Sequence, residues 1–76
     1  MPTLLMLKGF KFFFYANEHE PKHIHVIKDE YFAKIDLETL NVSKSTFRAK
    51  DLKFVLEVVK EHQIDFVRSW NDYFKG

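Results

Sequence analysis

The 76-residue chain contains no cysteine, so it can form neither a disulfide framework nor a zinc site built on thiolates. It has only two glycines and two prolines, and of these Gly9 and Pro21 interrupt the interior of the chain. Neither sign of charge dominates. Twelve basic and eleven acidic residues leave a net charge of +1, which excludes a strongly cationic nucleic-acid binder but not a local basic patch.

Long hydrophobic runs are also missing. The apolar stretch Leu4-Leu5-Met6-Leu7 is too short for a signal-peptide core or a membrane span, and no basic segment precedes it. We therefore expect a cytoplasmic protein that does not enter a membrane. The length predicts one small domain over residues 1–76, and nine Phe, three Tyr and one Trp supply the large apolar side chains that so small a core needs.

Alternating side chains in the first half of the chain predict a three-stranded antiparallel sheet. Phe10, Phe12 and Phe14 alternate with a second set of residues, and a polar turn containing Pro21 follows them. A short turn at Asp29-Glu30 separates the next two alternating segments. We expect strands over roughly 10–16, 23–28 and 31–37.

After Asn41 the hydrophobic period becomes helical. Apolar residues recur at the i, i+3, i+4, i+7 spacing, and the pattern continues through Trp70 to the end of the chain. One long helix or two consecutive helices, roughly 48–61 and 65–74, fit this stripe equally well. Because one face of the sheet needs a cover, the pattern predicts an α+β domain in which the helical stripe packs on the sheet.

Three of the four histidines, His19, His23 and His25, fall within seven residues. His23 and His25 are two positions apart, so they point to the same face of a strand, and His19 lies in the turn before them. Clustered imidazoles bind metals, transfer protons or contact phosphate. However, histidines on the open side of a sheet are often solvated residues that have no function.

The expected hairpin around Asp29-Glu30 defines the neighbours of these histidines. It places His23 opposite Asp36 and His25 opposite Lys34, close enough for the paired side chains to interact. On the other face it pairs the apolar residues that we expect beneath the helix, which are Ile24, Val26, Ala33 and Ile35. A slip by one residue would mix the two faces, which disfavours it.

Residues 17–26, Asn-Glu-His-Glu-Pro-Lys-His-Ile-His-Val, resemble the N-D-H-x-P-P-H-x-H-V signature of the bacterial domain-of-unknown-function family 4160 (DUF4160). The similarity extends to residues 33–40, to the opening Met1-Pro2-Thr3 and to the helical segment near Trp70. The chain departs from the family pattern at Lys22 and at Asp29-Glu30. The resemblance implies a component of a toxin–antitoxin-like two-protein module, encoded beside a small protein of domain-of-unknown-function family 2442 (DUF2442).

Three classes of function are compatible with these observations. The first is an RNA-directed protein with a metal-independent, ribonuclease-like activity and no cofactor. In it His23 and His25 would act as general acid and base, Asp36 would orient one of them and Lys34 would hold the phosphate.

The second class is a metal protein in which His19, His23 and His25 bind zinc or nickel, with Asp36 as a fourth ligand or as a hydrogen-bond partner of a ligand. The third is a non-catalytic domain whose exposed aromatic residues contact the neighbouring DUF2442-like protein or a second copy of the chain as a homodimer. The sequence does not decide between them, so whether the protein is an enzyme stays open at this point.

Overall fold

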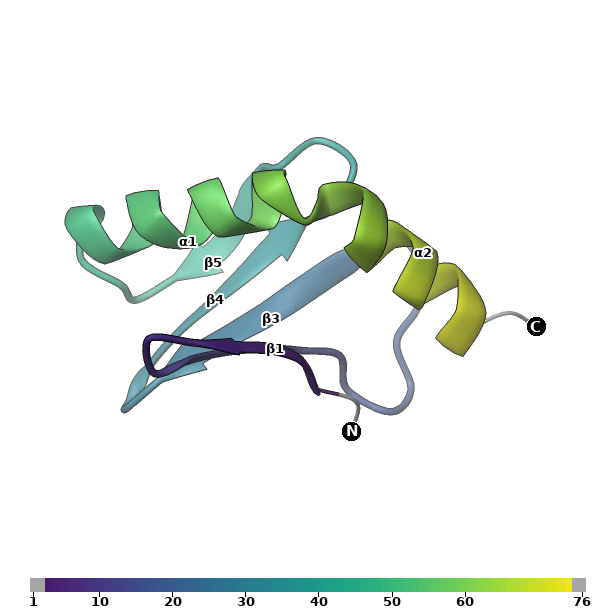
Figure 1. The fold of residues 1–76 in the computed structure, drawn as a ribbon, viewed down its shortest axis with the longest axis horizontal. Helices are drawn as coiled ribbons and strands as arrows, with labels where there is room; N and C mark the ends of the chain where they lie inside the picture. The colour runs from purple at the N-terminus through teal and green to yellow at the C-terminus, as the bar shows by residue number, and fades with distance from the viewer. Residues whose placement is uncertain (1–2, 75–76) are drawn as a thin grey trace.

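A computed structural model describes residues 3–74; Met1 and Pro2, which belong to the family-like opening, lie outside this range. The described residues form five strands and then two helices (Figure 1). The elements are β1 (Thr3–Leu7), β2 (Phe10–Phe13), β3 (His23–Lys28), β4 (Tyr31–Asp36), β5 (Val42–Ser45), α1 (Ala49–Glu61) and α2 (Gln63–Tyr73). The predicted α+β class is therefore confirmed.

The expected sheet of three strands was incomplete, because the sheet has five strands in the order β1-β2-β3-β4-β5, all antiparallel. β1 joins β2 through the two-residue turn Lys8–Gly9, in which both residues have positive φ (51° and 85°), as a tight hairpin turn requires. β5 pairs with the far side of β4. The two additional strands are the edges of the sheet.

The central hairpin has the register that the sequence predicts. His23 pairs with Asp36 and His25 with Lys34 across β3 and β4. The apolar residues of the opposite face, Ile24, Val26, Ala33 and Ile35, have no exposed surface. Asp29 adopts a positive φ of 55° in the turn, a conformation that aspartate tolerates better than most residues.

β2 ends at Phe13, three residues before the boundary expected from the alternation. The last pair between β2 and β3 is Phe13 with His25, and beyond it the N–H of Tyr15 points to Oε2 of Glu18 at 3.3 Å. The backbone therefore leaves the ladder to begin the loop of residues 14–22, which carries Glu18 and His19. The loop contains one cis peptide bond, between Glu20 and Pro21.

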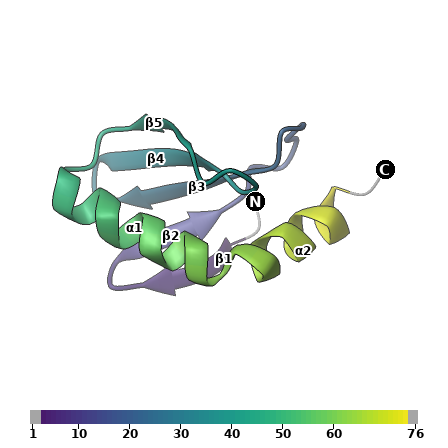
Figure 2. The ribbon, with the colours of Figure 1, turned by 90° about the horizontal axis from the view of Figure 1, so that it is seen from above.

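The helical stripe forms two helices, which answers the question that the sequence left open. His62 lies at the joint: its N–H donates to the carbonyl of Val58, and its carbonyl accepts the N–H of Phe66. Seen from above, α1 and α2 follow one another along the same side of the sheet (Figure 2). No helix among residues 3–74 is long and apolar enough to cross a membrane.

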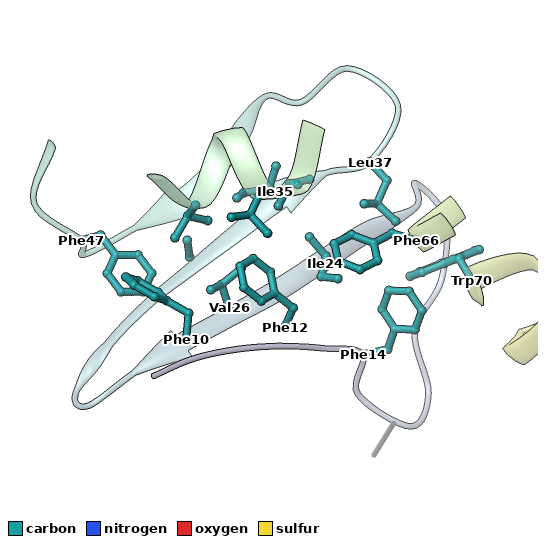
Figure 3. Close-up of a cluster of buried hydrophobic side chains, with 14 residues drawn as sticks. Phe10, Phe12, Phe14, Ile24, Val26, Ile35, Leu37, Phe47, Phe66 and Trp70 are labelled. Atoms are coloured by element: carbon teal, nitrogen blue, oxygen red, sulfur yellow. The ribbon is translucent and has the colours of Figure 1, made fainter. Parts of the chain in front are cut away.

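One hydrophobic core fills the space between the sheet and the helices (Figure 3). Phe10, Phe12 and Phe14 point into it from the start of the chain, and Phe66 and Trp70 enter it from α2. Both helices lie on this side of the sheet (Figure 1 and Figure 2). The other side, here called the open face, carries strand residues that alternate with the core: Met6, Lys11, Phe13, His23, His25, Ile27, Phe32, Lys34, Asp36 and Lys44.

Candidate functional site

The candidate site forms where the loop of residues 14–22 folds back over the start of β3. β3 presents His23 and His25 on the open face, as expected for residues two apart on a strand. The loop brings the carboxylate of Glu18 against both imidazoles. These three residues, here called the Glu–His–His cluster, are the only group of candidate metal ligands found among the described residues 3–74.

Glu18 contacts one histidine with each carboxylate oxygen. Its Oε2 lies 2.6 Å from Nε2 of His25, and its Oε1 lies 3.0 Å from Nε2 of His23. The first contact is a short hydrogen bond, and the second lacks hydrogen-bond geometry, so Nε2 of His23 is buried without a hydrogen-bond partner among the described residues. The carboxylate thus bridges the two imidazoles unequally.

The ring of His23 is held from its other nitrogen. Nδ1 lies 2.7 Å from the carbonyl oxygen of Pro21. A carbonyl only accepts hydrogen bonds, so Nδ1 carries a proton and donates it. The ring is also buried, and Trp70 of α2 packs against it with the ring centroids 5.1 Å apart. The orientation of His23 is therefore fixed by the loop on one side and by the helix on another.

His25 is enclosed by aromatic side chains of the open face. The ring of Phe13 stacks on it at 5.6 Å, and Tyr15 meets it edge-on at 4.5 Å. Burial lowers the pKa of His25 below its ordinary value of 6.5, and the attraction of Glu18 only partly offsets this effect. The imidazole is therefore neutral at pH 7, and its Nε2–H donates to Glu18.

The carboxylate of Glu18 is ionised. Its partial burial raises its pKa, but the contacts with His23 and His25 outweigh this, so the pKa lies below the ordinary value of 4.5. Sequence reasoning did not include this residue. Glu18 precedes His23 by five positions in a polar turn, and no periodic pattern connects a turn residue to a strand face.

The other residues singled out from the sequence lie around this cluster. His19 is exposed and is not part of it. Lys34 is directly across from His25, and its positive charge contributes to the lowered pKa of that imidazole.

Asp36 pairs with His23 across β3 and β4, but its carboxylate accepts hydrogen bonds from the backbone. Its Oδ1 accepts the N–H groups of Glu38 and Thr39, each at 2.8 Å, and these bonds hold its pKa below the ordinary value. The position that the sequence assigned to Asp36, a carboxylate beside an imidazole, is occupied in the fold by Glu18.

The geometry of the cluster suits two kinds of chemistry. One ligand atom from each of Glu18, His23 and His25 lies within 4.8 Å of the other two, a spacing from which they can converge on a metal ion. The short bond between Glu18 and His25 is equally the arrangement by which a carboxylate orients an imidazole for proton transfer.

Comparison with known proteins gives one finding. Residues 9–71 match the model of the family described as Domain of unknown function (DUF4160), and this span includes the loop, both histidines of β3 and most of α2. No curated protein and no solved structure matches the chain. Since the match covers most of the sequence, the chain belongs to the DUF4160 family.

Proposed function

We propose that the protein binds a divalent transition metal through Glu18, His23 and His25. The observation that carries the proposal is the surroundings of the two ring nitrogens of His23. Because Pro21 holds the proton on Nδ1, a neutral His23 presents a bare lone pair on Nε2 to an ionised carboxylate oxygen 3.0 Å away. Two acceptors at this distance repel each other unless a proton or a cation lies between them.

A metal ion satisfies both atoms at once. Metal-binding histidines commonly donate their second ring N–H to a backbone carbonyl, which fixes the tautomer, and His23 has this contact to Pro21. Two ligands about 2.0–2.1 Å from a tetrahedral ion lie about 3.3 Å from each other. The two contacts of Glu18, at 2.6 and 3.0 Å, therefore need to open by about 0.7 and 0.3 Å.

The donor set selects the class of metal. Two imidazoles and one carboxylate suit zinc, nickel or another first-row transition metal, whereas magnesium and calcium prefer sites built from oxygen. His25 is neutral because burial lowers its pKa, so it can bind a metal through Nε2 once its single ring proton has moved to Nδ1. Three protein ligands leave a coordination position for water or a substrate. In this ligand set Glu18 takes the place proposed for His19.

Zinc titration of untagged, chelator-treated protein by calorimetry tests the proposal. We expect one zinc per chain, and we expect Glu18→Gln and His25→Gln to weaken binding by at least about 10- to 100-fold, the loss typical even of outer partners of a metal. His19→Ala is the matched control, because it removes the exposed neighbouring imidazole and should leave binding unchanged. Absence of stoichiometric binding, or equal losses in His19→Ala, would overturn the proposal.

The hydrogen bond between His25 and Glu18 supports a second candidate, proton transfer without a metal. His25 would act as general acid or base on RNA, Glu18 would orient it in place of Asp36, and Lys34 would contact phosphate. Chelation separates the two candidates. If RNA cleavage is metal-independent, it persists in excess chelator and is lost in His25→Gln. If it depends on the metal, it is lost both in excess chelator and in His25→Gln.

Membership of the family also supports a proposal about the protein's role, namely that it is one component of a two-protein, toxin–antitoxin-like module. The resemblance described above names a DUF2442-like protein as the other component. Co-expression of the two proteins and purification through a tag on the partner alone tests this. Recovery of both in a fixed ratio is the expected result, and recovery of the tagged protein alone would contradict it.

A further inference from the structure

Charge is distributed unevenly between the two layers of the fold. The five described strands contain four lysines and a single acidic residue, Asp36, whereas α1 and α2 together contain four basic and five acidic residues. The carboxylate of Asp36 is already engaged by two backbone N–H groups. The nearly neutral chain therefore carries a basic sheet beneath a slightly acidic helical layer.

Three of the strand lysines lie on the open face. Lys34 pairs with Lys44 across β4 and β5, and with His25 across β4 and β3. Lys11 lies on the same face, with its Nζ over the ring of Phe13. Lys28 is the exception, because its Nζ lies over Phe10 on the core side. Two like charges directly opposed on neighbouring strands, as at Lys34 and Lys44, repel each other without an anion between them.

Aromatic side chains lie among these lysines and are exposed. Phe32 is 41% exposed and Tyr15 is 49% exposed, on either side of the row Phe13–His25–Lys34–Lys44. Tyr15 is held in place by edge-on contacts to Phe13 and His25. Phe32 therefore offers a flat apolar surface two positions from Lys34 on β4, and Tyr15 offers a second one beside Phe13 and His25.

We propose that the open face binds single-stranded nucleic acid, with phosphates contacting Lys34 and Lys44 and bases stacking on Phe32 and Tyr15. Sequence-tolerant binding of single strands generally combines these two elements, a cationic track and aromatic platforms. The row from Phe13 to Lys44 spans three gaps between strands, about 14 Å at the usual spacing of about 4.8 Å, which accommodates a short stretch of extended strand.

The same observations disfavour a protein as the occupant. Lysine is depleted at protein–protein interfaces relative to the remaining surface, whereas three lysines separate the apolar residues of this face. Binding of a polyanion also removes the repulsion between Lys34 and Lys44. The proposal does not depend on the metal centre, and the two can fail separately.

Fluorescence anisotropy with labelled RNA and DNA strands of about 10 nucleotides tests the proposal, with chelator present throughout so that metal plays no part. The double variant Lys34→Ala/Lys44→Ala is compared with Lys50→Ala/Lys53→Ala, which removes two exposed lysines from α1 on the other layer. We expect Lys34→Ala/Lys44→Ala to bind the strands more weakly than the wild type. The slope of log affinity against log salt should also become shallower by about 1.4, because each phosphate contact contributes about 0.7 in single strands.

Phe32→Ala tests the stacking separately and should weaken binding about 5- to 150-fold. Circular dichroism establishes that each variant is folded. Equal affinities for the two lysine pairs would overturn the proposal, as would wild-type protein that fails to bind either strand at low salt. Loss of a co-purifying protein in Phe32→Ala, without any nucleic-acid binding by the wild type, would assign the face to a protein partner and would also overturn it.

Discussion

Trp70 of α2 packs against the ring of His23 on β3, with the ring centroids 5.1 Å apart and the planes tilted by 57°. Trp70 also meets Phe14 edge-on at 5.3 Å, so one side chain contacts both the hydrophobic core and the Glu–His–His cluster. A residue of the last helix therefore packs against a site whose ligands come from the loop of residues 14–22 and from β3. Docking of α2 and the position of His23 should be coupled.

This coupling predicts the effect of truncating Trp70. Trp70→Ala should lower the free energy of unfolding by about 3–5 kcal/mol, because it removes a large buried ring, and it should also release His23. Tyr73→Ala is the control on the same helix, since Tyr73 is 47% exposed and should change stability by about 0.5 kcal/mol or less. Urea unfolding of both variants measures the difference, and similar losses would contradict the coupling.

The tautomers of the two histidines are a second prediction. In metal-free protein His23 should carry its proton on Nδ1, because that atom donates to Pro21, and His25 should carry its proton on Nε2, because that atom donates to Glu18. Long-range proton–nitrogen correlation spectra distinguish these forms. A neutral His23 protonated on Nε2 would remove the conflict between acceptors from which the metal site is inferred.

Stability of the metal-free protein should fall with acid in two steps. The pKa of His25 is lower in the folded chain, so below about pH 6.5 the unfolded chain binds the proton first and the folded state loses stability. The pKa of Glu18 is also lower in the folded chain, so its contribution is complete above 4.5 and is lost as pH falls through the folded pKa.

Thermal unfolding in chelator between neutral pH and pH 4.5 measures the first step. His25→Gln should flatten the dependence near pH 6.5, whereas His19→Ala should leave it as in the wild type. A melting temperature that rises as the pH falls through this range would show that the folded chain binds protons more tightly, against the direction expected here.

Asp36 should matter for stability and not for the site. Asp36→Ala removes the acceptor for the N–H groups of Glu38 and Thr39 and should cost about 1 kcal/mol, since the turn is exposed. Asp36→Asn retains a carbonyl acceptor and should recover much of this loss. Neither variant should alter metal binding; a loss of zinc affinity in Asp36→Asn would assign Asp36 a role beside His23 after all.

The sequence predicted the central part of this fold well. The alternation in β3 and β4 determined which residues face the core, because a slip by one residue would turn His23 toward the core and Ile24 toward the open face. β5 was missed because its sequence Val-Ser-Lys-Ser has little apolar alternation. β1 was missed for the opposite reason: Leu4 to Leu7 are apolar throughout and give no period to recognise.

The site was predicted only in part. Strand periodicity placed His23 and His25 side by side, but it described them as surface residues, and His23 is buried because α2 reaches the start of β3. The position of Glu18 depends on the path of an irregular loop, and local sequence patterns do not determine that path. Sequence reasoning chose the cross-strand neighbour Asp36 instead, although backbone N–H groups compete for that carboxylate.

X-ray absorption spectroscopy of the zinc-loaded, untagged protein tests the metal proposal most directly. The Glu–His–His cluster predicts two imidazole nitrogens at about 2.0–2.1 Å and carboxylate oxygen at about 2.0–2.2 Å. The spectrum of Glu18→Gln should differ from this, and that of His19→Ala should be identical to the wild type. A shell with three imidazoles that loses one in His19→Ala, or a shell with none, would contradict the assignment of Glu18, His23 and His25 as the ligands.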